Sequence, residues 1–390
     1  MTLSLSPRVA KVPFPPISAV REQLVARPED GLELVDLCQA VPDYPPAESL
    51  RKHLSSVVND CMTARYTQDE GLPNVREEIS CWYERFYVQG PASEEICLTI
   101  GASQAFWLAM NVLCEPGDEV IVPLPAYFDH LMGLGALGIT ANHIPYEETS
   151  SGVPALESVA KRITPRTKAL LLVTPSNPSG VVITADELAG FFDMARQHDI
   201  MLVVDETYNA FLPPGVATHG LFARREWQKN FIHLASFGKT FALTGFRAGA
   251  LVASRAIIRQ ALKVQDSMVV CQPHITQLAL AYACTHLDSW VSERNREMQQ
   301  RQSLFRDALL AADSRFELLS AGGFFAWVKH PCRGVSSVAV VERLICEAHI
   351  ACLPGSAFGP GLDNYLRLAI GNLPVAEIDS AVARLACWKA

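Results

Sequence analysis

Short runs of apolar residues alternate with amphipathic stretches from about residue 95 onward. The apolar runs lie at residues 120–122, 169–173, 201–204, 231–234 and 248–252. Runs of this length that are apolar throughout are typical of strands buried on both faces. Between them, Thr184-Ala185-Asp186-Glu187 has the capping-box pattern of a helix start. The alternation predicts an α/β fold with a largely parallel sheet covered by helices on both sides.

The last third of the chain follows a different pattern. Residues 274–312 have helical periodicity with a break near 286–288, and strand signals at 324–328 and 365–370 are interleaved with helical segments at 337–348 and 375–385. We therefore predict two domains. Residues 46–285 would form a large domain and residues 286–390 a small C-terminal α+β domain. Residues 1–45 would form an N-terminal arm that belongs in part to the small domain.

Composition excludes several classes of partner and site. The formal net charge is −8, and no cluster of Lys and Arg offers the basic surface that nucleic acids require. The eleven cysteines are scattered without a Cys-x-x-Cys spacing, so we expect reduced core residues and neither disulfides nor a metal site. The N-terminus lacks a signal-peptide pattern, and no apolar run approaches membrane-spanning length, which predicts a cytoplasmic protein without a membrane partner.

The segment Ser236-Phe237-Gly238-Lys239-Thr240 follows the apolar run at 231–234, and Arg247 comes eight residues after the lysine. A lysine at the end of such a strand can face a ligand crevice. In an apolar site its amine loses its charge more readily, and the neutral amine attacks aldehydes. Ser236 and Arg247 together suit one phosphate group. Taken alone, the segment is more simply an exposed loop with a lysine.

Three further polar residues follow other predicted strands. Asp205 ends the run at 201–204, and a carboxylate there is costly unless a cation meets it, such as a protonated pyridine nitrogen. Tyr208 lies three residues further on, and Asn177 follows the run at 169–173. Both could bond to the ring oxygen of the same cofactor. The simpler alternatives are a helix cap or salt bridge for Asp205, a core tyrosine, and a plain turn.

The earlier strand ends carry small residues and an aromatic one. Gly101-Ala102-Ser103 opens a helix after Leu98-Thr99-Ile100, where backbone N–H groups could cradle a phosphate. Tyr127 follows the run at 120–122 and could stack on a flat cofactor. Many strand–helix turns look like the first segment, and plain packing explains Tyr127 equally well.

Taken together, these segments resemble the class I/II aminotransferases of pyridoxal-phosphate (PLP) fold type I, and they occur in the family's order. The shared motifs are Pro42-Asp43-Tyr44-Pro45-Pro46, residues 66–76, Asn177-Pro178, Asp205-Glu206-x-Tyr208, Ser236-x-x-Lys239, Gly245-x-Arg247-x-Gly249 and Leu366-Arg367-Leu368. They span almost the whole chain. The resemblance implies a large PLP-binding domain with a mostly parallel seven-stranded sheet between helices, and a smaller α+β domain built from both termini.

The resemblance also assigns roles to single residues. Lys239 would form the Schiff base with PLP and carry protons. The residues that would hold the cofactor are Ala102, Ser103, Tyr127, Asn177, Asp205, Tyr208, Ser236 and Arg247. Tyr66 would reach the phosphate of a neighbouring subunit, which implies a homodimer with shared sites. Arg367 would clamp the substrate α-carboxylate, with Ala40 and Asn177 beside it.

Two residues depart from the family pattern. Ala40 stands where many relatives have glycine, and its methyl group would narrow the pocket or change the loop. Gly238 precedes the lysine where many relatives have serine or alanine. We expect this change to be tolerated, because Ser236 retains the phosphate role.

These observations predict an aminotransferase that moves an amino group between an L-amino acid and a 2-oxo acid by a ping-pong mechanism. A PLP-dependent C–S lyase remains the alternative, because the residues that hold the cofactor are shared. A regulatory protein is disfavoured, because the fold begins too early for a DNA-binding domain in front of it. Val41, Tyr44 and Phe358 favour a neutral or aromatic substrate.

Overall fold

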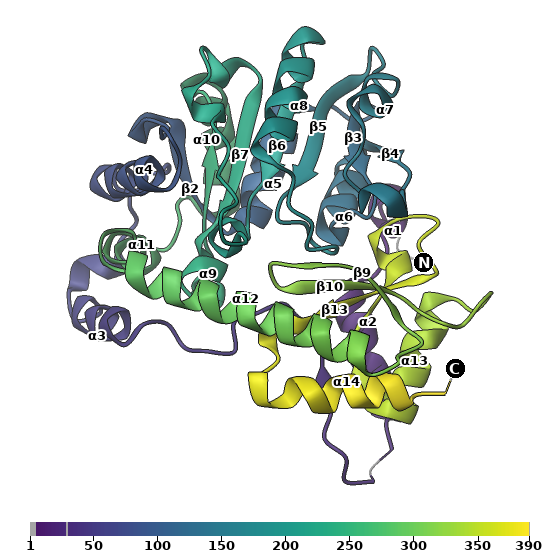
Figure 1. Cartoon of the computed structure of the whole chain (residues 1–390). Helices are drawn as coiled ribbons and strands as arrows, with labels where there is room; N and C mark the ends of the chain where they lie inside the picture. Colours follow the sequence, from purple (N-terminus) through teal and green to yellow (C-terminus); the bar gives the residue numbers. More distant parts are fainter. Residues whose placement is uncertain (1–4, 29, 390) are drawn as a thin grey trace.

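A seven-stranded sheet forms the centre of the computed structural model, which describes residues 5–28 and 30–389 (Figure 1). In chain order its strands are β2 (Ile96–Ile100), β3 (Glu119–Pro123), β4 (Thr140–Ile144), β5 (Thr167–Val173), β6 (Met201–Asp205), β7 (Phe231–Ser236) and β8 (Ala248–Val252). They lie in the order β2-β8-β7-β6-β5-β3-β4, and β8 is the one strand of this sheet that runs opposite to the other six. The predicted seven-stranded, mostly parallel sheet is confirmed.

Helices cover both faces of this sheet. One face carries α5 (Ala102–Leu113), α6 (Phe128–Leu137) and α10 (Arg255–Val269), and the other carries α4 (Pro73–Phe86), α8 (Ala185–Gln197) and α11 (His274–His286). Successive strand residues point into opposite layers: Leu171 and Val203 face the first, whereas Leu172 and Val204 face the second. Both layers are apolar, which is why the strands read as continuous apolar runs.

The predicted helix boundaries depend on local chemistry that the sequence already shows. At the start of α8, the Thr184 hydroxyl accepts a hydrogen bond from the Glu187 N–H at 3.2 Å, and the Glu187 carboxylate accepts one from the Thr184 N–H at 2.7 Å. This is the expected capping box. The predicted break near 286–288 is confirmed as the end of α11 at His286, followed by Leu287 and the start of α12 (Asp288–Ala311).

A second, four-stranded antiparallel sheet lies beside the long helix α12 (Figure 1). It contains β9 (Glu317–Gly322), β10 (Phe325–Lys329), β12 (Leu353–Pro354) and β13 (Tyr365–Ala369), with α13 (Ser337–Ala348) and α14 (Ile378–Cys387) nearby. The N-terminal segment contains α1 (Pro7–Ala10), α2 (Pro16–Gln23), β1 (Val35–Asp36) and, further on, α3 (Glu48–Val57). Since β1 pairs with β11 (Ile350–Ala351), the two ends of the chain meet in this part of the molecule.

All eleven cysteines are free thiols, but they are not all core residues. Cys61, Cys81 and Cys387 are exposed, so the expectation of buried cysteines is wrong for these three. Cys81 lies within α4, where apolar periodicity places its neighbours Ile79 and Trp82 inside and leaves position 81 toward solvent. Among the helices that the structure describes, none combines the length and apolar character needed to cross a membrane.

Candidate active site

A cavity of about 520 Å³ opens where the strands of the large sheet end at their carboxyl side. It is lined by almost all of the residues that the sequence selected: Ala40, Ala102, Ser103, Tyr127, Asn177, Asp205, Tyr208, Ser236, Lys239, Arg247 and Arg367. Tyr66 is absent from this lining, and its side chain is 80% exposed. The chain therefore brings together residues from position 40 to position 367 around one hollow.

One end of the cavity gathers groups that suit a phosphate. Gly101 adopts φ +86° as the N-cap of α5, so the first N–H groups of the helix point outward without intrahelical partners. A Cβ at Gly101 would lie 2.7 Å from Nη2 of Arg247, which shows how closely the guanidinium covers this turn. The hydroxyls of Ser103 and Ser236 line the same cavity. N–H, O–H and guanidinium donors around one small space fit a phosphate dianion.

Lys239 lies in the one-turn helix α9 (Phe237–Thr240) that directly follows β7, and its side chain enters the cavity. Its amine donates a hydrogen bond to the backbone carbonyl of Ala40. Burial lowers the pKa of Lys239 to about 8, and the positive charges of Arg367 and Arg247 act in the same direction. A substantial neutral fraction near neutral pH is what an amine needs to attack an aldehyde.

Asp205 is the last residue of β6 and lies on the cavity wall with 3% of its surface exposed. One oxygen lies 3.1 Å from Nε2 of His130, and the other accepts hydrogen bonds from Thr207 N–H at 2.9 Å and from its hydroxyl at 2.7 Å. Burial works to raise the pKa of Asp205, but the hydrogen bond and charge of His130 outweigh it and lower the pKa. The carboxylate is therefore kept ionised, as the partner of a protonated ring nitrogen must be.

Sequence reasoning missed His130, although a signal was present. Tyr127 and His130 are three residues apart at the start of α6, so both side chains lie on the side of the helix that faces the cavity. The rings of Phe106 and His130 lie 4.5 Å apart between centroids, which fixes the imidazole against Asp205. His130 and Asp205 are far apart in sequence, so their pairing becomes visible only in the three-dimensional structure.

Arg367, on β13, is the clamp predicted for the substrate carboxylate. Its guanidinium is 1% exposed and donates to Oδ1 of Asn177 at 3.0 Å and to the carbonyl oxygen of Cys38. The rings of Phe325 and Phe358 lie 5.1 and 5.3 Å from the guanidinium carbon and hold it in one plane. A buried guanidinium oriented in this way presents a fork suited to a carboxylate.

The two residues that depart from the family pattern are both accommodated. Ala40 is buried at the cavity wall, and its carbonyl oxygen meets the Lys239 amine. A methyl group at Gly238 would lie 3.3 Å from Cα of Thr244, so a small side chain would be tight there but not excluded.

Val41, Tyr44 and Phe358 do not line the cavity that the described residues form, so its lining does not support the substrate preference predicted from them. The ring of Tyr44 packs instead on Trp290, with 5.7 Å between the ring centroids, and under Arg294.

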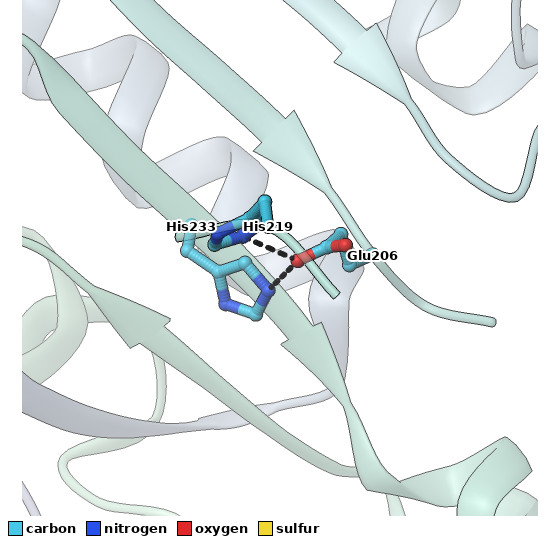
Figure 2. Close-up of side chains that lie close together, drawn as sticks. All are labelled: Glu206, His219 and His233. Carbon is cyan, nitrogen blue, oxygen red and sulfur yellow. Dashed lines mark hydrogen bonds and ion pairs between the residues drawn. The ribbon is translucent and has the colours of Figure 1, made fainter. Parts of the chain in front are cut away.

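A second buried carboxylate, Glu206, lies on the opposite side of β6 from the cavity. Its Oε2 is 2.9 Å from Nε2 of His219 and 2.9 Å from Nε2 of His233 (Figure 2), and it accepts the Tyr87 hydroxyl at 2.8 Å. The Tyr83 hydroxyl lies 3.0 Å from Nδ1 of His233. We call these five residues the Glu206 cluster; each is buried.

The Glu206 cluster has the composition of a metal site but the hydrogen bonding of a closed network. Nδ1 of His219 accepts the N–H of Leu221 at 3.2 Å, which places the imidazole proton on Nε2. A protonated Nε2 donates to Glu206 and cannot bind a cation. Because Oε2 of Glu206 already receives three bonds, we assign the cluster as a structural network.

Comparison with known proteins identifies the family. A model for "Aminotransferase class I and II" matches residues 33–385. Aromatic-amino-acid aminotransferase 2 of Thermococcus litoralis is 26% identical over 374 residues, which cover 93% of this chain and 95% of the relative. The aspartate aminotransferase of Pyrococcus abyssi is 27% identical over 356 residues, which cover 90% and 91%.

Solved structures agree over the whole length. The aspartate aminotransferase of Rhizobium meliloti has a TM-score of 0.90 at 25% identity, with 98% of both chains covered. That of Thermus thermophilus with maleate has a TM-score of 0.90 at 26% identity, with 99% of both covered. Since these relatives are named aminotransferases, amino-group exchange is favoured over the C–S lyase alternative. The chain belongs to the class I and II aminotransferase family, and it is a pyridoxal-phosphate-dependent aminotransferase that acts on amino acids and 2-oxo acids.

Proposed function

We propose that Lys239 carries the cofactor and moves the substrate proton in a ping-pong exchange between an L-amino acid and a 2-oxo acid. The observation that carries this proposal is the convergence of Lys239, Asp205 and Arg367 on one cavity. When bound, PLP supplies an aldehyde that takes up amino groups and a ring that accepts the electron pair of a broken Cα–H bond. The protein must then hold the ring, orient the substrate and transfer one proton.

Each task has a residue in a suitable place. The α5 N-terminus with Ser103, Ser236 and Arg247 would bind the phosphate, and Asp205 would pair with the ring nitrogen. Tyr208 and Asn177 would bond to the ring oxygen, and Tyr127 would stack on the ring face. These groups end or follow β2, β3, β5, β6 and β7 or, in the case of Arg247, directly precede β8, so the sheet fixes their positions relative to one another.

Substrate orientation would depend on Arg367. Its fork binds the α-carboxylate and so directs the Cα–H bond toward the Lys239 amine, which takes up the proton and later returns it. The pKa of Lys239, lowered to about 8, lets the amine act as a base near neutral pH. Asn177 bonds to Arg367 at 3.0 Å and is thereby shared between the substrate clamp and the cofactor.

The first test is the replacement Lys239→Ala. The purified protein should show a visible absorbance band when PLP is added, and the variant should lose both this band and all transamination activity. Lys168→Ala is the matched control, because Lys168 lies on β5 outside the cavity and pairs with Asp118 at 3.8 Å. A variant without Lys239 that keeps the band and the activity would contradict the assignment.

We also propose a homodimer in which Tyr66 of each subunit reaches the phosphate of the other. Tyr66 is 80% exposed, and Val58 and Met62, which precede it, are also exposed apolar residues. An exposed apolar strip next to a site residue is typical of a subunit interface. Sedimentation equilibrium would show about twice the chain mass of 42.7 kDa, and a monomer at working concentration would overturn the proposal.

The division into an arm at 1–45, a large domain at 46–285 and a small domain at 286–390 is proposed as well. The pairing of β1 with β11 supports the placement of the arm with the small domain. Cleavage by limited proteolysis at positions far from 45 and 285 would argue against these boundaries. A cytoplasmic location is also proposed, and cell fractionation tests it.

A further inference from the structure

The charged residues that line the cavity differ in whether the proposed mechanism uses them. Among the described lining residues, the basic groups are Lys239, Arg247, Arg367 and His130, and each is already matched to the cofactor, to the substrate α-carboxylate or to Asp205. One charged residue of the lining has no assigned role, and it is the acid Asp129. The charge that is left without a role on the described cavity wall is therefore negative.

Asp129 lies on the face of α6 that borders the cavity. Met132, Gly133 and Ala136 follow it at helical spacing and line the same hollow. Val12, from the N-terminal segment, completes this wall. Apart from Asp129 the wall is apolar, so a substrate side chain that enters it meets one negative charge at the end nearest Tyr127.

The surroundings of Asp129 explain why a negative charge is stable there, but they do not neutralise it. Asp129 is in the first turn of α6, where a carboxylate is favoured by the helix dipole, and one of its oxygens accepts the Tyr127 hydroxyl at 2.6 Å. Within the described residues this is the one hydrogen bond that the carboxylate receives. The residue is half-buried, and no basic side chain pairs with it.

The field of Asp129 extends to the cofactor-binding residues. Burial raises the pKa of Tyr208 well above its usual range; Arg367 opposes this, and Asp205 and Asp129 add to it. The same carboxylate lies next to Tyr127, whose pKa is raised by burial and then by Asp129. The charge therefore acts within the cavity and not only on bulk solvent.

We propose that Asp129 is a specificity-determining residue, whose carboxylate repels a carboxylate on the substrate side chain and restricts the amino donor to side chains without negative charge. The inference rests on the proposed function, because a side-chain subsite exists only if Arg367 and Lys239 hold an amino acid here.

The test compares phenylalanine with aspartate as amino donor to the PLP-loaded protein, read as the cofactor absorbance change of the first half-reaction. The protein should convert phenylalanine with the higher kcat/KM. Asp129→Asn keeps an acceptor for Tyr127 but removes the charge, and it should raise the aspartate/phenylalanine ratio of kcat/KM about 10-fold or more, chiefly through the KM for aspartate.

Tyr127→Phe is the matched control, because it removes the same hydrogen bond and keeps the charge. It should leave the aspartate/phenylalanine ratio near that of the unaltered protein even if it slows both donors. Preference for aspartate by the unaltered protein, as a cation from a second subunit would produce, overturns the inference. An Asp129→Asn variant that slows both donors equally overturns it too. Failure to convert any donor would instead refute the proposed function.

Discussion

Asp205 and Glu206 are consecutive carboxylates at the end of one strand, yet their surroundings differ completely. Asp205 faces the cavity, where His130 and Thr207 bind it and one side remains open to a ligand. Glu206 faces the core, where two imidazoles and the Tyr87 hydroxyl converge on a single oxygen. The period of two along a strand separates them onto opposite faces of the sheet.

The difference shows how one sequence motif can serve two purposes. A buried charge is tolerated when hydrogen bonds satisfy it. At Glu206 three donors meet on one oxygen in the core and tie the strand end to Tyr87, His219 and His233. At Asp205 three contacts are divided between the two oxygens on the cavity wall, and we propose that this position makes the carboxylate available to a cofactor. We expect substitutions of Asp205 to affect mainly activity and substitutions of Glu206 to affect mainly stability.

The largest expected effect is that of Asp205→Asn on turnover. Two unit charges about 4 Å apart interact by about 4 kcal/mol at an effective dielectric constant of about 20. If Asp205 holds a protonated ring nitrogen, loss of its charge should lower kcat roughly 1000-fold. The free energy of unfolding should change by less than about 1 kcal/mol, because an amide can still accept the Thr207 bonds. Rapid-kinetic and denaturant measurements would check both, and a large loss of stability with kcat preserved would reverse our comparison.

Glu206→Ala should act on stability instead. It would leave three buried donors without an acceptor and lower the free energy of unfolding by roughly 3–5 kcal/mol. Urea titration measures this loss, and Glu77→Ala on the exposed face of α4 serves as the surface control. If the two variants were equally stable, the Glu206 cluster would have no structural role.

The stability that Glu206 contributes should also depend on pH. Burial favours a higher pKa for Glu206, but His219 and His233 lower it more, so the folded pKa lies well below the usual range. Its charge therefore contributes stability in full above the unfolded value of about 4.3, and this contribution is lost as the pH falls toward the folded pKa. The stability gap between the unaltered protein and Glu206→Ala should narrow below about pH 4.

Tyr87→Phe should give the smallest effect. It removes one of the three donors to Glu206 and the acceptor of the Asn209 amide, so we expect a loss of about 1.5 kcal/mol with turnover nearly unchanged. The same urea titration applies. A loss as large as that of Glu206→Ala would mean that the cluster acts as one unit whose bonds cannot be removed singly.

Much of this fold can be predicted from the sequence because local patterns and tertiary structure agree. The buried strands β5 and β6 and the capped helix α8 carry their own signals of burial and helix start. The apolar pattern does not predict the edge strand β4. Thr140–Ile144 is partly exposed at the sheet margin, so this strand needs no continuous run of apolar residues.

The site was predictable to the extent that its residues follow strands. Lys239 and Asp205 could be selected because the ends of parallel strands meet at one edge of a sheet. His130 has only its spacing of three residues from Tyr127 as a signal, and Asp129 has none, since both act through the packing of α6 against the cavity. The exposure of Tyr66 likewise has meaning only in relation to a second chain.

The spread of the cavity lining along the chain has a consequence for biosynthesis. The turn at Gly101 that we propose binds the phosphate, Asp205 and Lys239 all emerge from the ribosome well before Arg367, which lies close to the C-terminus. A nascent chain can therefore complete the seven-stranded sheet, and with it the cofactor-binding surface, before any means of gripping a substrate exists. On the proposed roles, premature termination within the last strands would leave a protein that takes up the cofactor but lacks the arginine that orients an amino acid.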